Sequence, residues 1–249
     1  MTGSLKGKTA LVTGGSAGIG TAVVEALASE GALVAFTYRR SKESAEALVS
    51  RLEGEGRRVK AYQADVAGFG RAQQVVDDIL TTFGGLDILV NNAGANQDKV
   101  IWKMTEEGWD EVIATDLKGV FNYIRAVAPH FKEKKAGKII TVSSINGLRG
   151  KFGQSNYAAA KAGVIGLSKS VAKELGGFNV NVNVVCPGII GTEMIKSMPE
   201  EVLNKSISEV VLGRLGAPED VAAVIAFLAS EGARHITGEV IKVDGGQYI

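Results

Sequence analysis

The stretch Thr13-Gly14-Gly15-Ser16-Ala17-Gly18-Ile19-Gly20 decides the fold of this 249-residue chain. It follows a short apolar run at Leu11-Val12, and a helical pattern of apolar residues begins at once. Glycines in such a strand-to-helix turn let the backbone approach a pyrophosphate, and the helix N-terminus directs free N–H groups at it. Without these flanking elements the glycines would indicate only a tight turn. The residues predicted to bind a dinucleotide here are Gly14, Ser16, Gly18, Ile19 and Gly20.

Further apolar runs of about four residues follow, and helix-period stretches separate them. The runs are rich in β-branched and aliphatic residues, which is typical of strands buried on both faces of a parallel sheet. They lie at residues 33–36, 59–62, 88–90, 139–142, 182–185 and 240–243. No linker, repeat or composition break interrupts the series. We predict one α/β domain over residues 1–249, a Rossmann-type doubly wound fold of about seven parallel strands with helices on both faces.

Residues 188–216 interrupt this alternation of strand and helix patterns. The segment opens at Gly188, ends at Gly216, and carries helical hints without a strand pattern. Segments outside the regular alternation often carry function and can move over a bound ligand. We therefore expect residues 188–216 to cover a substrate site, and the alternative is an ordinary helical insertion.

Charge and composition exclude several classes of protein. Lys plus Arg number 28 and Asp plus Glu number 27, so the net charge of +1 gives no electrostatic case for nucleic acid or a membrane surface. A single cysteine, Cys186, and two histidines argue against a disulfide framework and against a metal site. No apolar run approaches the roughly 18 residues of a membrane span, and the N-terminus lacks a signal-peptide core. We expect a cytoplasmic protein with neither a nucleic-acid nor a membrane partner.

The end of the second predicted strand favours one dinucleotide. NAD binders usually place Asp or Glu there, about 20 residues beyond the glycine turn, to hold the ribose hydroxyls. Here the residues are Thr37-Tyr38-Arg39-Arg40. An arginine would pair with the 2′-phosphate of NADP(H), and such a charge-assisted hydrogen bond contributes about 1.5–3 kcal/mol. We predict NADP(H), bound through Arg39 and Arg40. The alternative is that both arginines are solvated at the start of a helix.

Two further strand ends suit the adenosine half of the cofactor. Asp65 follows the third predicted strand, where it can accept from the adenine amino group or cap the helix that starts near Phe69. The fourth strand ends in Asn91-Asn92-Ala93-Gly94, whose small residues leave room for the ribose and whose asparagines can tie neighbouring strands together. The predicted contacts of this half are Asp65, Val66, Asn92, Ala93 and Gly94.

Tyr157 and Lys161 carry the predicted chemistry, because positions i and i+4 share one face of a helix. A tyrosine with a pKa of about 10 is a poor acid or base at neutral pH. An ammonium about 5 Å away would favour the phenolate by about 3 kcal/mol, or about two pKa units. Ser144 directly follows a predicted strand and can donate to a substrate carbonyl. Alone, such a pair is usually a surface pair and such a serine a turn former.

Together, these motifs resemble those of the short-chain dehydrogenase/reductase family from Lys8 to Tyr248. The resemblance implies hydride transfer between NADP(H) and a carbonyl–alcohol pair, with the cofactor supplying the hydride. It implies that Tyr157 is the general acid, that Lys161 lowers its pKa and binds the nicotinamide ribose, and that Ser144 orients the carbonyl. It also implies that the nicotinamide is held by Pro187, Gly188, Ile190 and Thr192.

Within the family, residues 154–163 and Val243-Asp244-Gly245-Gly246 are most similar to reductases of 3-oxoacyl-[acyl-carrier-protein] and of acetoacetyl-CoA. This implies NADPH-dependent reduction of a 3-oxoacyl thioester, on acyl carrier protein or coenzyme A, to the 3-hydroxyacyl thioester in fatty acid biosynthesis and lipid metabolism. The implied substrate residues are Ser144, Gln154 and Tyr157. The alternatives are an NAD(P)-dependent dehydrogenase of a steroid, sugar or cyclic alcohol, and a catalytically silent dinucleotide-binding protein.

The stretch Thr115-Asp116-Leu117-Lys118-Gly119 departs from the family, which usually has asparagine in place of Asp116. The resemblance implies that the asparagine keeps a water near Lys161, partly through its main-chain carbonyl, as a proton relay. Asp116 retains that carbonyl, loses the amide donor, and adds a negative charge that would partly offset the effect of Lys161 on Tyr157. We expect Asp116 to act in a working but slower relay.

The resemblance also implies a homotetramer, built from the helices around residues 106–134 and 155–176 and from the C-terminal strand. Ala158, Ala162 and Gly166 form a face of small residues that permits close packing between subunits or against the sheet. Lys169 and Lys173 are candidate contacts for an acidic carrier protein, or else part of a solvated face.

Overall fold

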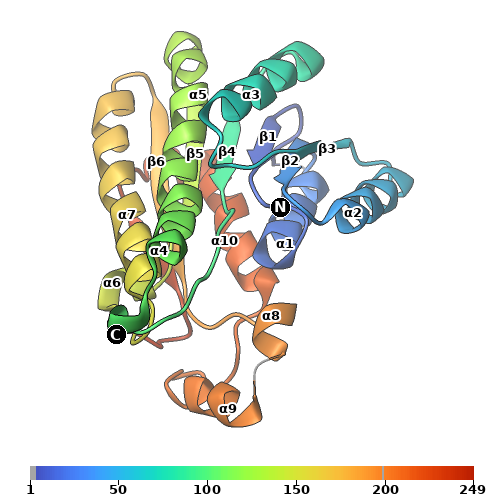
Figure 1. The fold of residues 1–249 in the computed structure, drawn as a ribbon. Helices are drawn as coiled ribbons and strands as arrows, with labels where there is room; N and C mark the ends of the chain where they lie inside the picture. Colours follow the sequence, from blue (N-terminus) through green and yellow to red (C-terminus); the bar gives the residue numbers. More distant parts are fainter. Residues whose placement is uncertain (1–3, 198) are drawn as a thin grey trace.

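The computed structural model describes residues 4–197 and 199–249. In this part of the chain, seven parallel strands form one sheet in the order β3-β2-β1-β4-β5-β6-β7 (Figure 1). The strands are β1 (Thr9–Val12), β2 (Leu33–Tyr38), β3 (Val59–Gln63), β4 (Ile88–Asn91), β5 (Gly137–Val142), β6 (Val180–Pro187) and β7 (Val240–Val243). The predicted parallel α/β fold is confirmed, and every predicted strand lies within an observed one.

Helices cover both faces of the sheet (Figure 1). One face packs against α1 (Gly18–Ser29), α2 (Lys42–Gly54) and α10 (Pro218–Ala229), and the other against α3 (Phe69–Phe83), α5 (Gly119–Lys134) and α7 (Ser155–Gly176). Successive strand residues point to opposite faces. Thus Ala10 and Val12 of β1 belong to the first core and Leu11 to the second. Burial on both faces explains why the strands are unbroken apolar runs.

Shorter elements connect this framework to the site. They are η1 (Ile101–Lys103), α4 (Glu106–Val112), the π-helical turn η2 (Ile113–Lys118), α6 (Asn146–Arg149), α8 (Glu193–Lys196), α9 (Glu200–Ser208) and η3 (Glu231–Ala233). The π-turn inserts between α4 and α5, and such turns occur often at functional sites. No helix in the described ranges is long and apolar enough to cross a membrane.

The strand order reverses between β1 and β4, which lie side by side at the centre of the sheet. Asn92 ties their ends together, because its amide donates to the carbonyl oxygens of Thr13 (3.0 Å) and Gly14 (3.1 Å). The Thr13 hydroxyl oxygen accepts from the backbone N–H of Asn92. The predicted strand tie is confirmed for Asn92 and wrong for Asn91, whose amide has no hydrogen-bond partner among the described residues. Doubly wound sheets bind ligands at this reversal.

Residues 188–216 contain α8 and α9, which lie below the carboxyl ends of the strands in Figure 1. The two ends of the segment are adjacent, since Gly191 donates to Gly216 (2.8 Å) and Gly216 donates to Ile189 (3.1 Å). None of the residues 200–208 of α9 is buried. The helical hints in this segment are therefore confirmed, and α9 is joined to the body of the protein with little apolar packing.

A substitution at Phe131 of α5 tests the packing of the core between the sheet and helices α3, α5 and α7. The Phe131 ring is fully buried, and a Cβ at Gly137 of β5 would lie 2.5 Å from it. We expect Phe131→Ala to lower the free energy of unfolding by about 3–5 kcal/mol, because it leaves a large cavity. Urea titration measures the change. The control is Phe152→Ala, whose ring is 82% exposed and whose loss should cost less than about 0.5 kcal/mol. Equal losses in the two variants would contradict the prediction.

Candidate active site

A cavity of about 650 Å³ opens beside the carboxyl ends of the central strands. Most of the predicted site residues line it, although they come from distant parts of the chain. These are Gly14, Ser16, Ile19, Arg39, Asp65, Val66, Asn92, Ala93, Gly94, Asp116, Ser144, Gln154, Tyr157, Lys161, Pro187, Gly188, Ile190 and Thr192. Gly18, Gly20 and Arg40 lie outside the lining. Within the described ranges, no group of three or more His, Cys, Asp or Glu side chains could hold a metal ion.

The glycine turn makes one end of the cavity suitable for a pyrophosphate. Gly14 has a φ of +67°, and a Cβ at Gly20 would lie 2.1 Å from the Gly14 carbonyl oxygen. Gly20 is thus needed to close the turn, although it does not line the cavity. Ala17 at the N-cap of α1 provides no side-chain acceptor, and the first turn of α1 holds no acidic residue. The amide groups and the positive end of the helix dipole are therefore left for an anion, so the residues present fit a dinucleotide.

Arg39 and Arg40 occupy different environments. The Arg39 guanidinium lies 3.9 Å from the Asp65 carboxylate and 3.5 Å from that of Glu111, at the wall of the cavity. Arg40 is exposed, just before α2 begins at Lys42. The structure thus brings Arg39 to the cavity, whereas Arg40 matches the alternative of a solvated residue near a helix start.

Asp65 does not cap α3. The N-cap position of that helix is Gly68, and Asp65 accepts instead from the backbone N–H of Ala67 at 2.9 Å. Its carboxylate also lines the cavity. The alternative role of Asp65 as a helix cap is therefore wrong, and its side chain lies at the predicted adenosine end.

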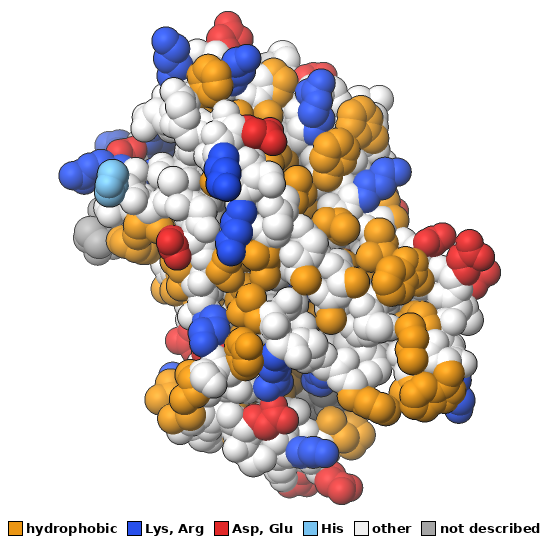
Figure 2. Space-filling view, turned by 90° about the vertical axis from the view of Figure 1, so that its left-hand side faces the viewer, with side chains coloured by type: hydrophobic (Ala, Val, Ile, Leu, Met, Phe, Trp, Pro, Cys, Tyr) orange, Lys and Arg blue, Asp and Glu red, His pale blue; other side chains and the backbone are white. Residues whose placement is uncertain are grey.

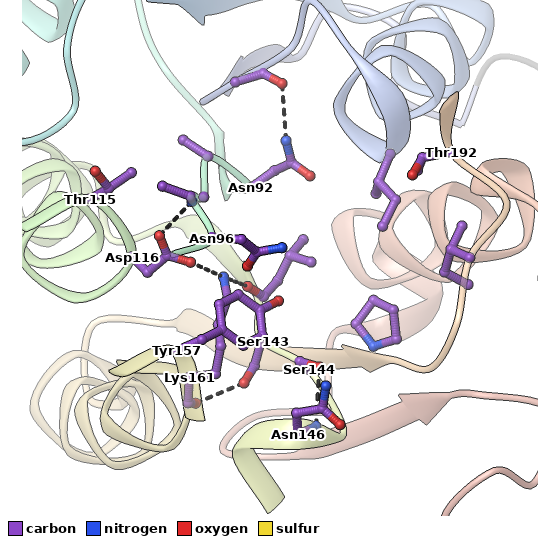
Figure 3. Close-up of a pocket in the computed structure, with 18 of the residues that line it drawn as sticks. Asn92, Asn96, Thr115, Asp116, Ser143, Ser144, Asn146, Tyr157, Lys161 and Thr192 are labelled. Carbon is purple, nitrogen blue, oxygen red and sulfur yellow. Dashed lines mark hydrogen bonds and ion pairs between the residues drawn. The ribbon is translucent and has the colours of Figure 1, made fainter. Parts of the chain in front are cut away.

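Tyr157 and Lys161 lie on one face of α7, as their spacing predicts (Figure 3). The Lys161 ammonium lies 5.4 Å from the centre of the Tyr157 ring and donates to the Val142 carbonyl at 3.1 Å. The Ser143 hydroxyl donates to the Lys161 carbonyl at 2.7 Å, which fixes α7 against the end of β5. Ser144 follows in the chain, is nearly buried, and lines the same cavity. The predicted surface-pair alternative is wrong, because Lys161 is buried.

Asp116 forms an ion pair with Lys161, with 3.1 Å between Oδ2 and Nζ (Figure 3). Its other oxygen accepts from the backbone N–H of Ala95 at 2.7 Å. The side chain of Asp116 is fully buried in the π-turn, and that of Lys161 is 4% exposed. The Asp116 carboxyl group thus lies beside Lys161, and its contacts link η2, α7 and the loop after β4.

Burial and Asp116 decide the acidity of Tyr157. Burial raises its pKa, Lys161 lowers it, and Asp116 raises it again, so the net direction is upward. Lys161 lowers the pKa of Tyr157 as expected, but the expectation that this pKa falls overall is wrong. Burial also raises the pKa of Asp116, although Lys161 opposes this. For Lys161, burial lowers the pKa, and Asp116 together with Tyr157 more than offsets this, so the ammonium is favoured.

Gln154 lies in the cavity with both ends of its amide already bonded. Its nitrogen donates to the Asp98 carboxylate at 2.8 Å, and its oxygen accepts from the Asn146 amide at 3.0 Å. The buried Asn156 amide donates to the carbonyls of Gln97 and Gly108, both at 3.0 Å. These contacts position the loop before α4 against α7. The sequence analysis missed Asp98, Asn146 and Asn156, and the only signal for Asn156 was its place directly before Tyr157.

Together, the fold and the site define a dinucleotide-binding α/β oxidoreductase with a tyrosine–lysine pair at its cofactor cavity. Comparison with known proteins gives the family. Residues 14–247 match the family model described as enoyl-(acyl carrier protein) reductase. The chain belongs to the short-chain dehydrogenase/reductase family, as its motifs predicted, and is an enzyme that uses a nicotinamide dinucleotide.

Named relatives match over almost their whole length. The chain is 44% identical over 242 residues to 3-oxoacyl-[acyl-carrier-protein] reductase FabG of Staphylococcus aureus (strain Mu50), covering 97% of this chain and 98% of the relative. It is 45% identical over 245 residues to FabG of Thermotoga maritima, covering 98% and 99%. It is 46% identical over 242 residues to acetoacetyl-CoA reductase of Rhizobium meliloti, covering 97% and 98%.

Replacing Asp116 by asparagine tests the effect of its charge. The carboxylate raises the pKa of Tyr157, so its removal should lower that pKa. Reduction needs the protonated phenol, so we expect the alkaline limit of the reductase activity of Asp116→Asn to move to lower pH. Turnover near neutral pH should rise by up to about tenfold, because a stronger general acid transfers its proton faster.

The measurement is kcat for ketone reduction across the neutral and alkaline range. Asp110→Asn is the matched control, because Asp110 is an exposed carboxylate on the neighbouring helix α4. Its profile should match that of the unaltered enzyme. Superimposable profiles for Asp116→Asn and the unaltered enzyme would show that the Asp116 charge has no catalytic consequence.

Proposed function

We propose that this enzyme reduces a 3-oxoacyl thioester, carried by acyl carrier protein or coenzyme A, to the 3-hydroxyacyl thioester with NADPH. The observation that carries the proposal is the convergence of Ser144, Tyr157 and Lys161 on the dinucleotide cavity. The relatives named as FabG and as acetoacetyl-CoA reductase support the thioester substrate. The reaction belongs to fatty acid biosynthesis and lipid metabolism.

The mechanism follows from groups that face the cavity. When bound, a nicotinamide dinucleotide would supply the hydride, and the residues of the glycine turn and of the strand ends would hold it. Ser144 orients the carbonyl oxygen of the substrate, and Tyr157 donates its phenolic proton to that oxygen as negative charge develops. The carbonyl carbon gains the hydride and the oxygen gains the proton, so the product is a hydroxyl group.

Lys161 and Asp116 support the proton transfer without contacting the reacting atoms. The Lys161 ammonium stabilises the phenolate that Tyr157 becomes, because opposite charges attract strongly at a buried site. The Asp116 carboxylate keeps Lys161 charged. Burial and Asp116 raise the pKa of Tyr157 and Lys161 opposes them, so Lys161 is the group that makes the phenol a stronger proton donor.

We propose NADP(H) because of Arg39. Its guanidinium lines the cavity, where a 2′-phosphate would compete for it with the carboxylates of Asp65 and Glu111, and β2 ends without an acidic residue of its own. A 2′-phosphate would provide a charged partner at this wall of the cavity. We include Arg40 in the NADP(H) proposal. Because Arg40 does not line the cavity, it would attract the 2′-phosphate only through its positive charge and not through direct contact.

We propose that the chain is a single domain in which residues 188–216 cover the substrate side of the cavity. Ile195, Val202 and Ser206 of this segment line the cavity. The nicotinamide would be held where this segment leaves β6, by four residues that line the cavity: Pro187, Gly188, Ile190 and Thr192.

We propose a homotetramer built from the helices around residues 106–134 and 155–176 and from the C-terminal strand β7. Ala162 and Gly166 are exposed on α7, and a Cβ at Gly166 would meet no other atom of the described residues within 4 Å. The face of small residues therefore does not pack against the sheet. Figure 2 looks onto the side that carries α7, where hydrophobic side chains form patches between lysines and arginines. Lys169 and Lys173 are exposed on the same helix.

Tyr157→Phe tests the proposed reaction. We expect reduction of acetoacetyl-CoA with NADPH to fall by about 10²–10⁴-fold, because the variant lacks the proton donor. Binding of NADPH, followed by its fluorescence, should change by less than about twofold, since the ring is kept. Tyr248→Phe is the matched control, because Tyr248 is 38% exposed and does not line the cavity.

The same assay separates the alternatives. The unaltered enzyme is also given steroid, sugar and cyclic alcohols with NADP⁺. Faster turnover of an alcohol than of the thioester would favour the dehydrogenase alternative. Dinucleotide binding without turnover would favour the silent protein, and a fully active Tyr157→Phe would contradict the mechanism.

Arg39→Gln tests the choice of dinucleotide. We expect the KM for NADPH to rise about 10- to 100-fold, which corresponds to the loss of one charge-assisted hydrogen bond, while the KM for NADH stays nearly unchanged. Steady-state kinetics with acetoacetyl-CoA measure both. Arg40→Gln removes the same charge outside the cavity and should change both values by less than about threefold. A preference of the unaltered enzyme for NADH would overturn the proposal.

A further inference from the structure

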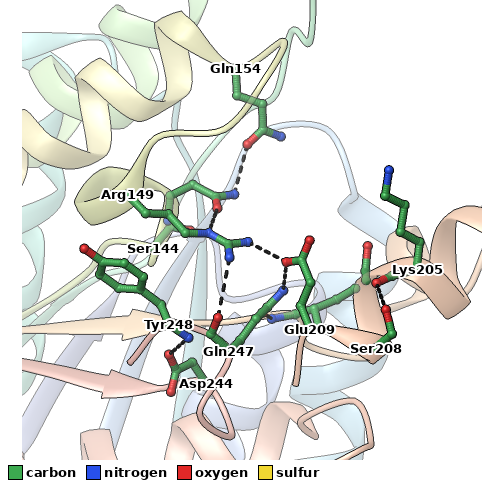
Figure 4. Close-up of polar contacts among 12 residues, drawn as sticks. Ser144, Arg149, Gln154, Lys205, Ser208, Glu209, Asp244, Gln247 and Tyr248 are labelled. Atoms are coloured by element: carbon green, nitrogen blue, oxygen red, sulfur yellow. Dashed lines mark hydrogen bonds and ion pairs between the residues drawn. The ribbon is translucent and has the colours of Figure 1, made fainter. Parts of the chain in front are cut away.

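Polar side chains from separate parts of the chain meet at Arg149, the last residue of α6 (Figure 4). Its guanidinium donates to the Glu209 carboxylate at 3.0 Å and to the Gln247 backbone carbonyl at 3.5 Å. Glu209 directly follows α9, and Gln247 lies near the C-terminus. The Arg149 side chain is 23% exposed and the Glu209 side chain 45%. The contacts therefore join α6, α9 and the C-terminal segment.

Gln247 closes the network. Its amide nitrogen donates to the same Glu209 oxygen at 3.2 Å, and its amide oxygen accepts from the Ile189 backbone N–H at 2.9 Å. A Cβ at Gly188 would lie 2.8 Å from that amide oxygen, so the packing here is tight. Gln247 thus contacts both the start of the 188–216 segment and the residue that follows α9. Hydrogen bonds from Arg149 and Gln247 lower the pKa of Glu209, so its carboxylate stays charged.

The network continues to the residue that orients the substrate. The Arg149 Nε donates to the Asn146 side-chain oxygen at 3.4 Å, and the Asn146 backbone N–H donates to the Ser144 hydroxyl oxygen at 3.1 Å. The Asn146 amide also donates to Gln154. A continuous series of polar contacts thus runs from Glu209, beside α9, to Ser144 in the cavity.

The position of α9 depends on such contacts. None of its residues 200–208 is buried, yet Val202 and Ser206 line the cavity. A helix without buried apolar residues obtains little stabilisation from its own packing, so polar contacts, together with the buried Val210 that follows Glu209, contribute strongly to where it lies. An isolated exposed ion pair contributes little, whereas groups that share partners act as a unit.

We propose that Arg149, Glu209 and Gln247 act as one positioning unit that holds α9 against the substrate side of the cavity and thereby sets the affinity for the acyl substrate. This inference rests on the proposed reductase function. The unit contacts neither Tyr157 nor the glycine turn, and Arg149 and Gln247 line the cavity themselves, so we expect it to act mainly on substrate binding.

Kinetics of Arg149→Gln, Glu209→Gln and the double variant test the unit. We expect each single variant to raise the KM for acetoacetyl-CoA about fivefold, with kcat and the KM for NADPH within about twofold. The double variant should also show about a fivefold rise, because residues of one unit are not additive, whereas independent residues would multiply to about 25-fold. Arg149→Lys can keep the ion pair with Glu209 but loses the contact with the Gln247 carbonyl. Its KM for acetoacetyl-CoA should therefore lie between those of the unaltered enzyme and Arg149→Gln.

Arg214→Gln is the matched control. Arg214 belongs to the same segment but pairs with Asp220 at 3.5 Å, and its side chain is 62% exposed. We expect its KM to equal that of the unaltered enzyme. A KM for acetoacetyl-CoA that rises in Arg149→Gln but not in Glu209→Gln would indicate direct contact of Arg149 with substrate and would overturn the unit. A KM of the double variant that rises by the product of the two single effects would also overturn it.

Trypsin cleavage after Lys205, an exposed residue of α9, tests the position of the helix without any activity. We expect cleavage of Arg149→Gln and Glu209→Gln to be about fivefold faster than that of the unaltered enzyme or Arg214→Gln, because a released helix opens more often. Equal cleavage rates would overturn the unit. Faster cleavage in a protein that reduces no thioester would support the unit and contradict the proposed function instead.

Discussion

The buried ion pair between Lys161 and Asp116 is the interaction on which this active site depends. Burial of a charge is costly unless a partner and further hydrogen bonds compensate it. Both side chains are almost completely buried, and each makes a second contact, Lys161 to the Val142 carbonyl and Asp116 to the Ala95 N–H. The pair therefore holds α7, β5, the π-turn and the loop after β4 in one arrangement, and Tyr157 takes its place from that arrangement.

The ion pair also sets the chemistry that Tyr157 can perform. A lone ammonium beside a phenol lowers its pKa, but here burial and the carboxylate of Asp116 both raise the pKa and together outweigh the ammonium. Asparagine at this position would leave the ammonium unopposed. The single change from amide to carboxylate therefore shifts the balance of the site toward the acid form of its tyrosine.

The two sides of the cavity are held by different forces. On the dinucleotide side, strands with apolar cores on both faces and the contact of Asn92 with Thr13 make a rigid wall. On the substrate side, α9 has no buried residue along 200–208 and is held by polar contacts through Glu209. The rigid dinucleotide side suits a cofactor that the whole family uses. The substrate side, which is held by polar contacts, suits a region that can differ between enzymes with different substrates.

The sequence by itself determined the strands, the glycine turn and the pairing of Tyr157 with Lys161, because each is a local pattern of burial or spacing. Only the tertiary structure decided the net acidity of Tyr157, since burial by elements distant in sequence exceeds the effect of its neighbour. It also decided that Arg39 rather than Arg40 lines the cavity. The contacts of Arg149 with Glu209 and Gln247 span 60 and 98 residues. No periodicity encodes such contacts, because they form only when the ends of separate elements meet.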